Sequence, residues 1–152
     1  METSIFQEAQ ERMNRLRLCL GTMITAAVLL LWAGAMAEIR INEVMASNGV
    51  YQDGHAYDWA ELYNDGAEVS LAGWYLSNDP YQPYKWAFPS GTKIAENGYL
   101  IVYCTGEGKE PMTDALCTNF KLSADGDTLY LTSPGGESTV LSFGTQFGNV
   151  SY

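Results

Sequence analysis

The only histidine of the chain, His55, is the residue on which nucleophilic catalysis would have to be built. It lies in a polar stretch between Asp53 and Asp58. A catalytic triad also needs a serine or cysteine within hydrogen-bond reach of the histidine, and no motif in the sequence presents one. We therefore expect His55 to be a solvated loop residue.

Carboxylates around the same stretch offer a second kind of chemistry. Asp53, Asp58, Glu61 and Asp65 supply hard oxygen ligands of the type that Ca²⁺ uses, but their spacing does not match an EF-hand loop. Asp53 and Asp65 are also typical turn residues. We expect no cofactor, with calcium as the alternative. A metal-dependent hydrolase that uses Asp53 and Asp58 is a further alternative.

Glu43 and Glu61 are the one pair that could act as glycosidase carboxylates. That mechanism needs a cleft and a separation of about 5–10 Å, and the sequence implies no cleft. Glu61 lies between large apolar neighbours. If its side chain faces inward, it needs partners such as backbone N–H groups or a lysine. The sequence therefore predicts no catalytic residue and a protein that is not an enzyme.

Aromatic residues give the clearer signal. Asp79–Tyr84 contains two prolines and two tyrosines, which predicts a rigid, exposed loop. Tyr81, Tyr84 and Trp86 are the candidate ligand-binding residues, because rigid aromatics give contact area at low entropic cost. Such a loop suits a protein or a glycan. The alternative is that Tyr81 and Tyr84 pack on a sheet edge and shield Trp86.

The chain has three cysteines, of which Cys19 lies in the apolar leader. Cys104 and Cys117 are left as an even pair, and in an oxidising compartment we expect a disulfide between them. The alternative is two buried thiols that pack as small apolar groups.

The elements that position these residues are short strands. In Asp58–Asp79, apolar and aromatic residues recur close to every second position, around a turn at Asn64-Asp65-Gly66. We place Trp74 in a central strand and expect Trp74→Ala to cost about 3–5 kcal/mol. The expected strands are 39–46, 59–64, 69–71, 74–77, 85–88, 99–104, 118–122, 128–132 and 139–143. This spacing predicts an all-β sandwich of about eight strands.

Residues 1–37 predict an export signal. Three arginines precede an apolar run at residues 18–37, which ends in Ala-Met-Ala before Glu38. These are the parts of a signal peptide that is cut after Ala37. The run is also close to the ~20 residues that span a bilayer, so without cleavage it would be a signal-anchor helix. In both cases we expect residues 38–152 to be secreted or extracytoplasmic.

Charge excludes some partners. The leader has three basic and three acidic residues, so the net charge of -10 falls on residues 38–152. An acidic surface repels nucleic acid and anionic headgroups. We expect membrane contact only through residues 18–37, if they are retained.

Five blocks of sequence resemble bacterial lamin-tail domains, in the same order. The blocks are Ile41–Asn48, Asp58–Asn64, Leu71–Ser77, Lys85–Pro89 and Thr118–Ser123. The resemblance implies an immunoglobulin-like β-sandwich and an exported accessory module, in which Glu61 is structural. In that family, catalysis belongs to joined domains such as nucleases, other hydrolases or spore-coat-H-type kinases.

Together these observations predict an exported, non-catalytic module for binding, docking or scaffolding at the cell envelope. Its partner would be a protein or a glycan. The alternative is the targeting domain of a larger exported enzyme whose catalytic part is absent from this chain.

Overall fold

The computed structural model describes residues 38–49, 56–106 and 115–152, and all regular elements in these ranges are strands. The predicted leader helix, Asp53 and His55 lie outside the described residues. Within the three ranges, no helix is long and apolar enough to cross a membrane.

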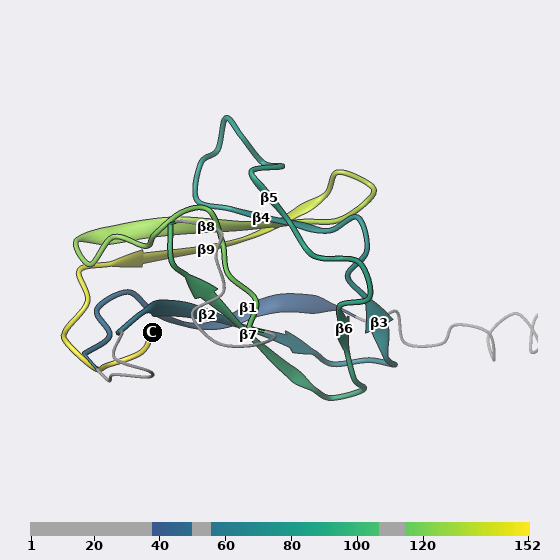
Figure 1. Ribbon diagram of the computed structural model, residues 1–152, viewed down its shortest axis with the longest axis horizontal. Coiled ribbons are helices and arrows are strands. Elements are labelled where there is room, and N and C mark those ends of the chain that lie inside the picture. Colours follow the sequence, from purple (N-terminus) through teal and green to yellow (C-terminus); the bar gives the residue numbers. More distant parts are fainter. Residues whose placement is uncertain (1–37, 50–55, 107–114) are drawn as a thin grey trace, which may run out of the picture. The chain divides into compact units, whose positions relative to one another are not determined.

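Nine strands are present in the described part of the chain, and Figure 1 shows them in two main layers. They are β1 (Ile39–Met45), β2 (Asp58–Asn64), β3 (Val69–Ser70), β4 (Tyr75–Ser77), β5 (Trp86–Ala87), β6 (Lys93–Ile94), β7 (Tyr99–Cys104), β8 (Gly126–Thr132) and β9 (Ser138–Gly144). One layer has the order β1-β2-β7 and the other β5-β4-β8-β9, while β3 and β6 pair separately. All of these strand pairs are antiparallel.

The period-two pattern of the sequence determines which side chains enter the core. In β2, Ala60, Leu62 and Asn64 are buried, while Glu61 and Tyr63 lie on the outer face. The Tyr63 ring packs against Tyr99, with a centroid distance of 4.7 Å.

The four-stranded layer faces the same core. Leu76 of β4 and Leu129 and Leu131 of β8 are fully buried, and Phe143 of β9 is nearly so. Contacts of β1 with both β8 and β9 join the two layers. The result is an all-β sandwich with a continuous apolar core, as the sequence predicts.

Three expectations need correction. Residues 118–122 form no strand; only Cys117 makes an isolated bridge, to Tyr103. Lys93–Ile94 is a strand that the sequence did not indicate, because two residues carry no detectable period. Trp74 precedes β4 and is half-buried at the margin of the core, whereas Leu76 occupies the centre of that strand.

Candidate binding surfaces

The loop Asp79–Tyr84 is held in shape by its first residue. The Asp79 carboxylate accepts hydrogen bonds from the backbone N–H of Tyr81 at 2.9 Å and from Nε2 of Gln82 at 2.8 Å. Gln82 N–H also donates to the Asp79 carbonyl at 3.1 Å. The Tyr81 ring is 92% exposed at this turn. The loop thus presents one aromatic ring to solvent on an internally bonded backbone.

The other two aromatic candidates are placed differently. Tyr84 is 58% exposed, and its ring meets the edge of Tyr75 on the sandwich at a centroid distance of 5.0 Å. Trp86 belongs to β5, packs edge-on against Phe88 at 4.8 Å and is half-buried. The Trp86 ring is thus partly used in packing against the core, and its role in ligand binding stays a prediction.

The described members of the acidic cluster are not brought together. Asp58 opens β2 and Asp65 follows its end, which places them roughly 20 Å apart at ~3.3 Å per residue. Asp65 accepts from Glu38 N–H at 3.0 Å and pairs with Arg40 at 3.5 Å. In the part of the chain that the structure describes, no three His, Cys, Asp or Glu side chains are arranged to hold a metal ion.

The burial of Asp58 at the start of β2 changes its acidity. Burial raises its pKa above the ordinary value, although the backbone N–H of Asn48 and the positive charge of Lys121 both favour the ionised form. The Asn48 N–H lies 3.3 Å from Asp58 Oδ1. This interaction closes the start of β2 against the loop after β1, which is a structural role.

Glu43 and Glu61 are opposite one another in the β1–β2 register. Glu61 accepts a hydrogen bond from Asn42 Nδ2 at 2.8 Å, and Glu43 accepts one from the Ser151 hydroxyl. Both lie on the outer face, and neither lines the pocket described below. The partner of Glu61 is therefore an amide side chain, and this pair has no cleft of the kind that glycoside hydrolysis needs.

Cys104 and Cys117 are both buried, and both are thiols in this structure. Cys117 pairs with Tyr103 in the bridge, so the Cys104 side chain leaves its strand on the opposite face. Burial raises the pKa of the Cys104 thiol far above its usual range, and a hydrogen bond with Thr118 only partly offsets this. The disulfide stays a prediction.

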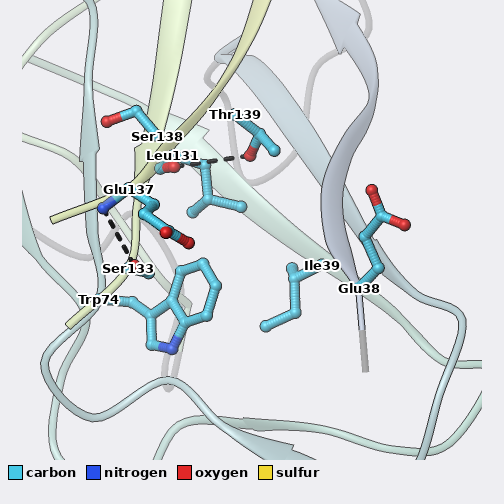
Figure 2. Close-up of a pocket in the computed structure, with 8 residues that line it drawn as sticks. All are labelled: Glu38, Ile39, Trp74, Leu131, Ser133, Glu137, Ser138 and Thr139. Carbon is cyan, nitrogen blue, oxygen red and sulfur yellow. Dashed lines mark hydrogen bonds between the residues drawn. The ribbon is translucent and has the colours of Figure 1, made fainter. Parts of the chain in front are cut away.

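A pocket of about 320 Å³ lies where the start of β1 meets the β8–β9 hairpin (Figure 2). Eight residues line it: Glu38, Ile39, Trp74, Leu131, Ser133, Glu137, Ser138 and Thr139. Ile39 and Leu131 are buried and apolar, whereas Glu38 and Glu137 are exposed. Figure 2 shows the Trp74 ring below the Glu137 side chain and to the left of Ile39, with Glu38 beyond Ile39 and its carboxylate directed away from the ring.

Two tight turns hold the walls of this pocket. Trp74 N–H donates to the Leu71 carbonyl at 3.0 Å, and Gly73 between them has φ 77, a conformation that favours glycine. In the β8–β9 hairpin, Ser133 N–H donates to the Glu137 carbonyl at 2.8 Å. The Glu137 N–H in turn donates to the Ser133 hydroxyl at 3.2 Å. Both Trp74 and Glu137 are therefore positioned by backbone bonds that do not use their side chains.

The chemistry of the pocket suits a cation. Its lining includes the Trp74 indole and the acidic residues Glu137 and Glu38, and it contains no lysine, arginine or histidine. Cations are attracted to the face of an indole ring and to carboxylates. A volume near the lower end of the usual range for small-molecule sites, roughly 300–1,000 Å³, matches one side chain or small headgroup.

Sequence reasoning did not find this pocket. Its residues come from positions 38–39, 74, 131 and 133–139, and only the packing of the two layers brings them together. The one available signal was Trp74, a large ring directly after a glycine turn, which was assigned to the core instead.

The comparison with protein families agrees with this architecture. A model of the Lamin Tail Domain matches residues 33–146, a range that contains every strand from β1 to β9. A search among curated proteins finds no match to the chain. Lamin tail domains are immunoglobulin-like and non-catalytic. The chain belongs to the lamin tail domain family.

Proposed function

We propose that residues 38–152 are a non-catalytic binding module that acts outside the cytoplasmic membrane and docks onto a protein or glycan of the cell envelope. The exported location rests on the charged and apolar pattern of residues 1–37. The proposal that the module is non-catalytic is supported by its family. It is also supported by the positions of Asp58, Glu61 and Asp65, each of which makes a separate structural hydrogen bond.

The exposed ring of Tyr81 is the observation that carries the proposal. An aromatic side chain that is 92% exposed contributes nothing to the core, yet its backbone is fixed by Asp79. A ring held in this way loses little conformational entropy when a partner covers it. Net charge of -10 further favours partners that are neutral or basic at their contact surface.

Photo-crosslinking in intact cells tests the proposal. A benzophenone amino acid would replace Tyr81 in the full chain, and a control chain would carry it at Glu96, which is exposed in the turn after β6. We expect a discrete envelope adduct from position 81 that is absent from position 96. Adducts of equal yield at both positions, or none at position 81, would contradict the proposed role of the loop.

A further inference from the structure

The free edge of β9 is the feature that points to a more specific partner. Sheet edges expose unpaired backbone groups, and proteins usually shorten, charge or cover them. In the described part of the molecule, the edge strand β5 is only two residues long. The outer edge of β1 is covered by Tyr152, which donates one backbone hydrogen bond to Val44 and accepts one from it. The outer edge of β7 is covered where Tyr103 bonds to Leu116 and Thr118. Among the described residues, β9 is seven residues long and pairs with β8 alone.

The hairpin bond defines which groups of β9 are available. Ser133 N–H donates to the Glu137 carbonyl, so the bonded pairs of the ladder continue at every second residue, through Leu131 and Thr139. The backbone groups of Ser138, Val140 and Ser142 consequently point away from β8. Ser138–Gly144 contains no charged residue and no proline, and Val140 is 55% exposed. Nothing in this sequence discourages another strand from pairing here.

The pocket lies beside this edge. Thr139 belongs both to β9 and to the pocket lining, and across the pocket are Glu38 and Ile39. Side chains of an added strand alternate between the two faces of the sheet. One that points inward next to Thr139 would therefore enter the pocket and meet Trp74 and Glu137 (Figure 2).

We propose that β9 binds an extended peptide segment of a partner protein by strand addition, and that a lysine or arginine of this segment occupies the Trp74 pocket. The backbone bonds along Ser138, Val140 and Ser142 supply affinity, and the pocket supplies selectivity for the basic residue. Glu137 neutralises its charge, while the indole of Trp74 contacts it through a cation–π interaction. This inference specifies the proposed binding function at a surface separate from Tyr81.

The test uses a displayed library of random 12-residue peptides, selected on protein purified from cells that express the full chain. We expect selected peptides to be enriched in lysine or arginine among β-branched residues. Val140→Pro blocks the outward edge without removing a bond to β8, because the Val140 N–H faces solvent. It should abolish binding of the selected peptides, whereas the matched control Val140→Thr should retain it.

Two further variants examine the pocket. Glu137→Lys reverses a charge while leaving the backbone bonds to Ser133 in place, and Trp74→Ala removes the ring. Each should weaken a selected peptide by about 10-fold, and changing the basic residue of that peptide to glutamate should do the same. Circular dichroism and thermal melting of every variant would establish that it is folded.

Several outcomes would overturn the inference. They are a selection that yields no binding peptides, selected peptides without basic enrichment, and binding that survives Val140→Pro in a folded protein. Tyr81→Ala separates the two proposals. Loss of binding in Tyr81→Ala alone would assign the peptides to the loop and leave β9 without a role, whereas loss in Val140→Pro alone would support β9 whatever the crosslinking at Tyr81 shows.

Discussion

The buried side chain of Asn64 forms hydrogen bonds through both its amide nitrogen and its amide oxygen. Its amide is completely buried, and Nδ2 donates to the carbonyls of Ala67 at 2.8 Å and Ala95 at 3.0 Å. Its Oδ1 accepts from Gly66 N–H at 3.1 Å. One side chain therefore holds the turn after β2 and the end of β6 together.

Replacing this amide should be costly. Asn64→Ala removes this acceptor from the buried Gly66 N–H and this donor from the carbonyls of Ala67 and Ala95, and we expect it to lower the free energy of unfolding by about 2–4 kcal/mol. The matched control is Asn119→Ala, which removes a single exposed hydrogen bond, from Nδ2 to the Lys85 carbonyl, and should cost less than about 1 kcal/mol. Urea unfolding of both variants measures the difference. Equal costs would show that the Asn64 network contributes no more than a surface bond.

Asp58 makes stability depend on pH. Because burial raises its pKa in the folded state, the folded protein binds a proton more tightly than the unfolded chain does. The contribution of Asp58 to stability is therefore fully present below the ordinary pKa of 3.8, and it is lost as pH rises from there through the raised pKa of the folded state. Asp58→Asn keeps an acceptor for Asn48 N–H without the charge.

We expect Asp58→Asn to match the parent at about pH 3 and to exceed its stability at about pH 7. Urea midpoints of both proteins across this range give the comparison. A variant that is less stable than the parent near neutral pH would show that the ionised carboxylate is favoured by its surroundings.

For single residues, the sequence predicts the local role of a side chain better than its hydrogen-bond partners. The end of β2 at Asn64 could be predicted, because Asn-Asp-Gly is typical of turns. Its bonds to β6 could not be predicted, since Ala95 lies 31 residues further along the chain. Glu61 likewise needed a partner, but its position outside the core, next to Asn42, depended on the register of β1 and β2.

Among the elements, the start of β8 gives a direct test of backbone geometry. Gly126 has φ 120, and a Cβ there would lie 3.0 Å from the Phe143 carbonyl oxygen. Gly144 is its partner in the ladder, and a Cβ there would meet nothing within 4 Å. These two glycines therefore form a matched pair in one register position.

We expect Gly126→Ala to destabilise the protein by about 1–3 kcal/mol, because alanine is strained at this φ. Gly144→Ala should be neutral or stabilising by up to about 1 kcal/mol, since it restricts the unfolded chain. Thermal melting of the two variants separates these effects. A neutral Gly126→Ala would mean that β8 begins in a different conformation.

The long strands could be predicted from the sequence, whereas pairing could not. Tyr99–Cys104 was predicted with its observed bounds, because a continuous apolar run between turn residues is typical of a buried strand. In residues 118–122 the alternation of buried and exposed side chains is real, with Thr118, Phe120 and Leu122 buried. In the part of the chain that the structure describes, however, these residues belong to no strand ladder and make only single backbone bonds, such as Thr118 N–H to the Tyr103 carbonyl.

At the scale of the whole molecule, the pocket between the layers changes the expected role of Trp74. Its ring forms an open wall, so Trp74→Ala should cost at least about 1 kcal/mol less than Leu76→Ala, which leaves a cavity in the core and should cost about 2–5 kcal/mol. Chemical denaturation of both variants decides this. A larger loss of unfolding free energy in Trp74→Ala than in Leu76→Ala would show that Trp74 is a core residue.

The fold class and the family could be predicted from the sequence because they rest on patterns within short blocks, such as Leu71–Ser77. The pocket could not, because Glu38, Trp74 and Glu137 approach one another only when the sandwich closes. Nor does the sequence distinguish the open edge at β9 from the covered edge at β1, since Tyr152 covers the latter through backbone bonds alone.

The open edge of β9 is the central claim about how this module binds, and amide hydrogen exchange measured by NMR tests it most directly. In the protein without a partner, we expect protected amides at Thr139, Leu141 and Phe143 and rapid exchange at Ser138, Val140 and Ser142. Residues Tyr130–Thr132 of β8 are an internal control, because they pair with both β4 and β9 and their amides should be protected at consecutive positions. Uniform protection along β9 would show that its edge is already covered, and would contradict the claim.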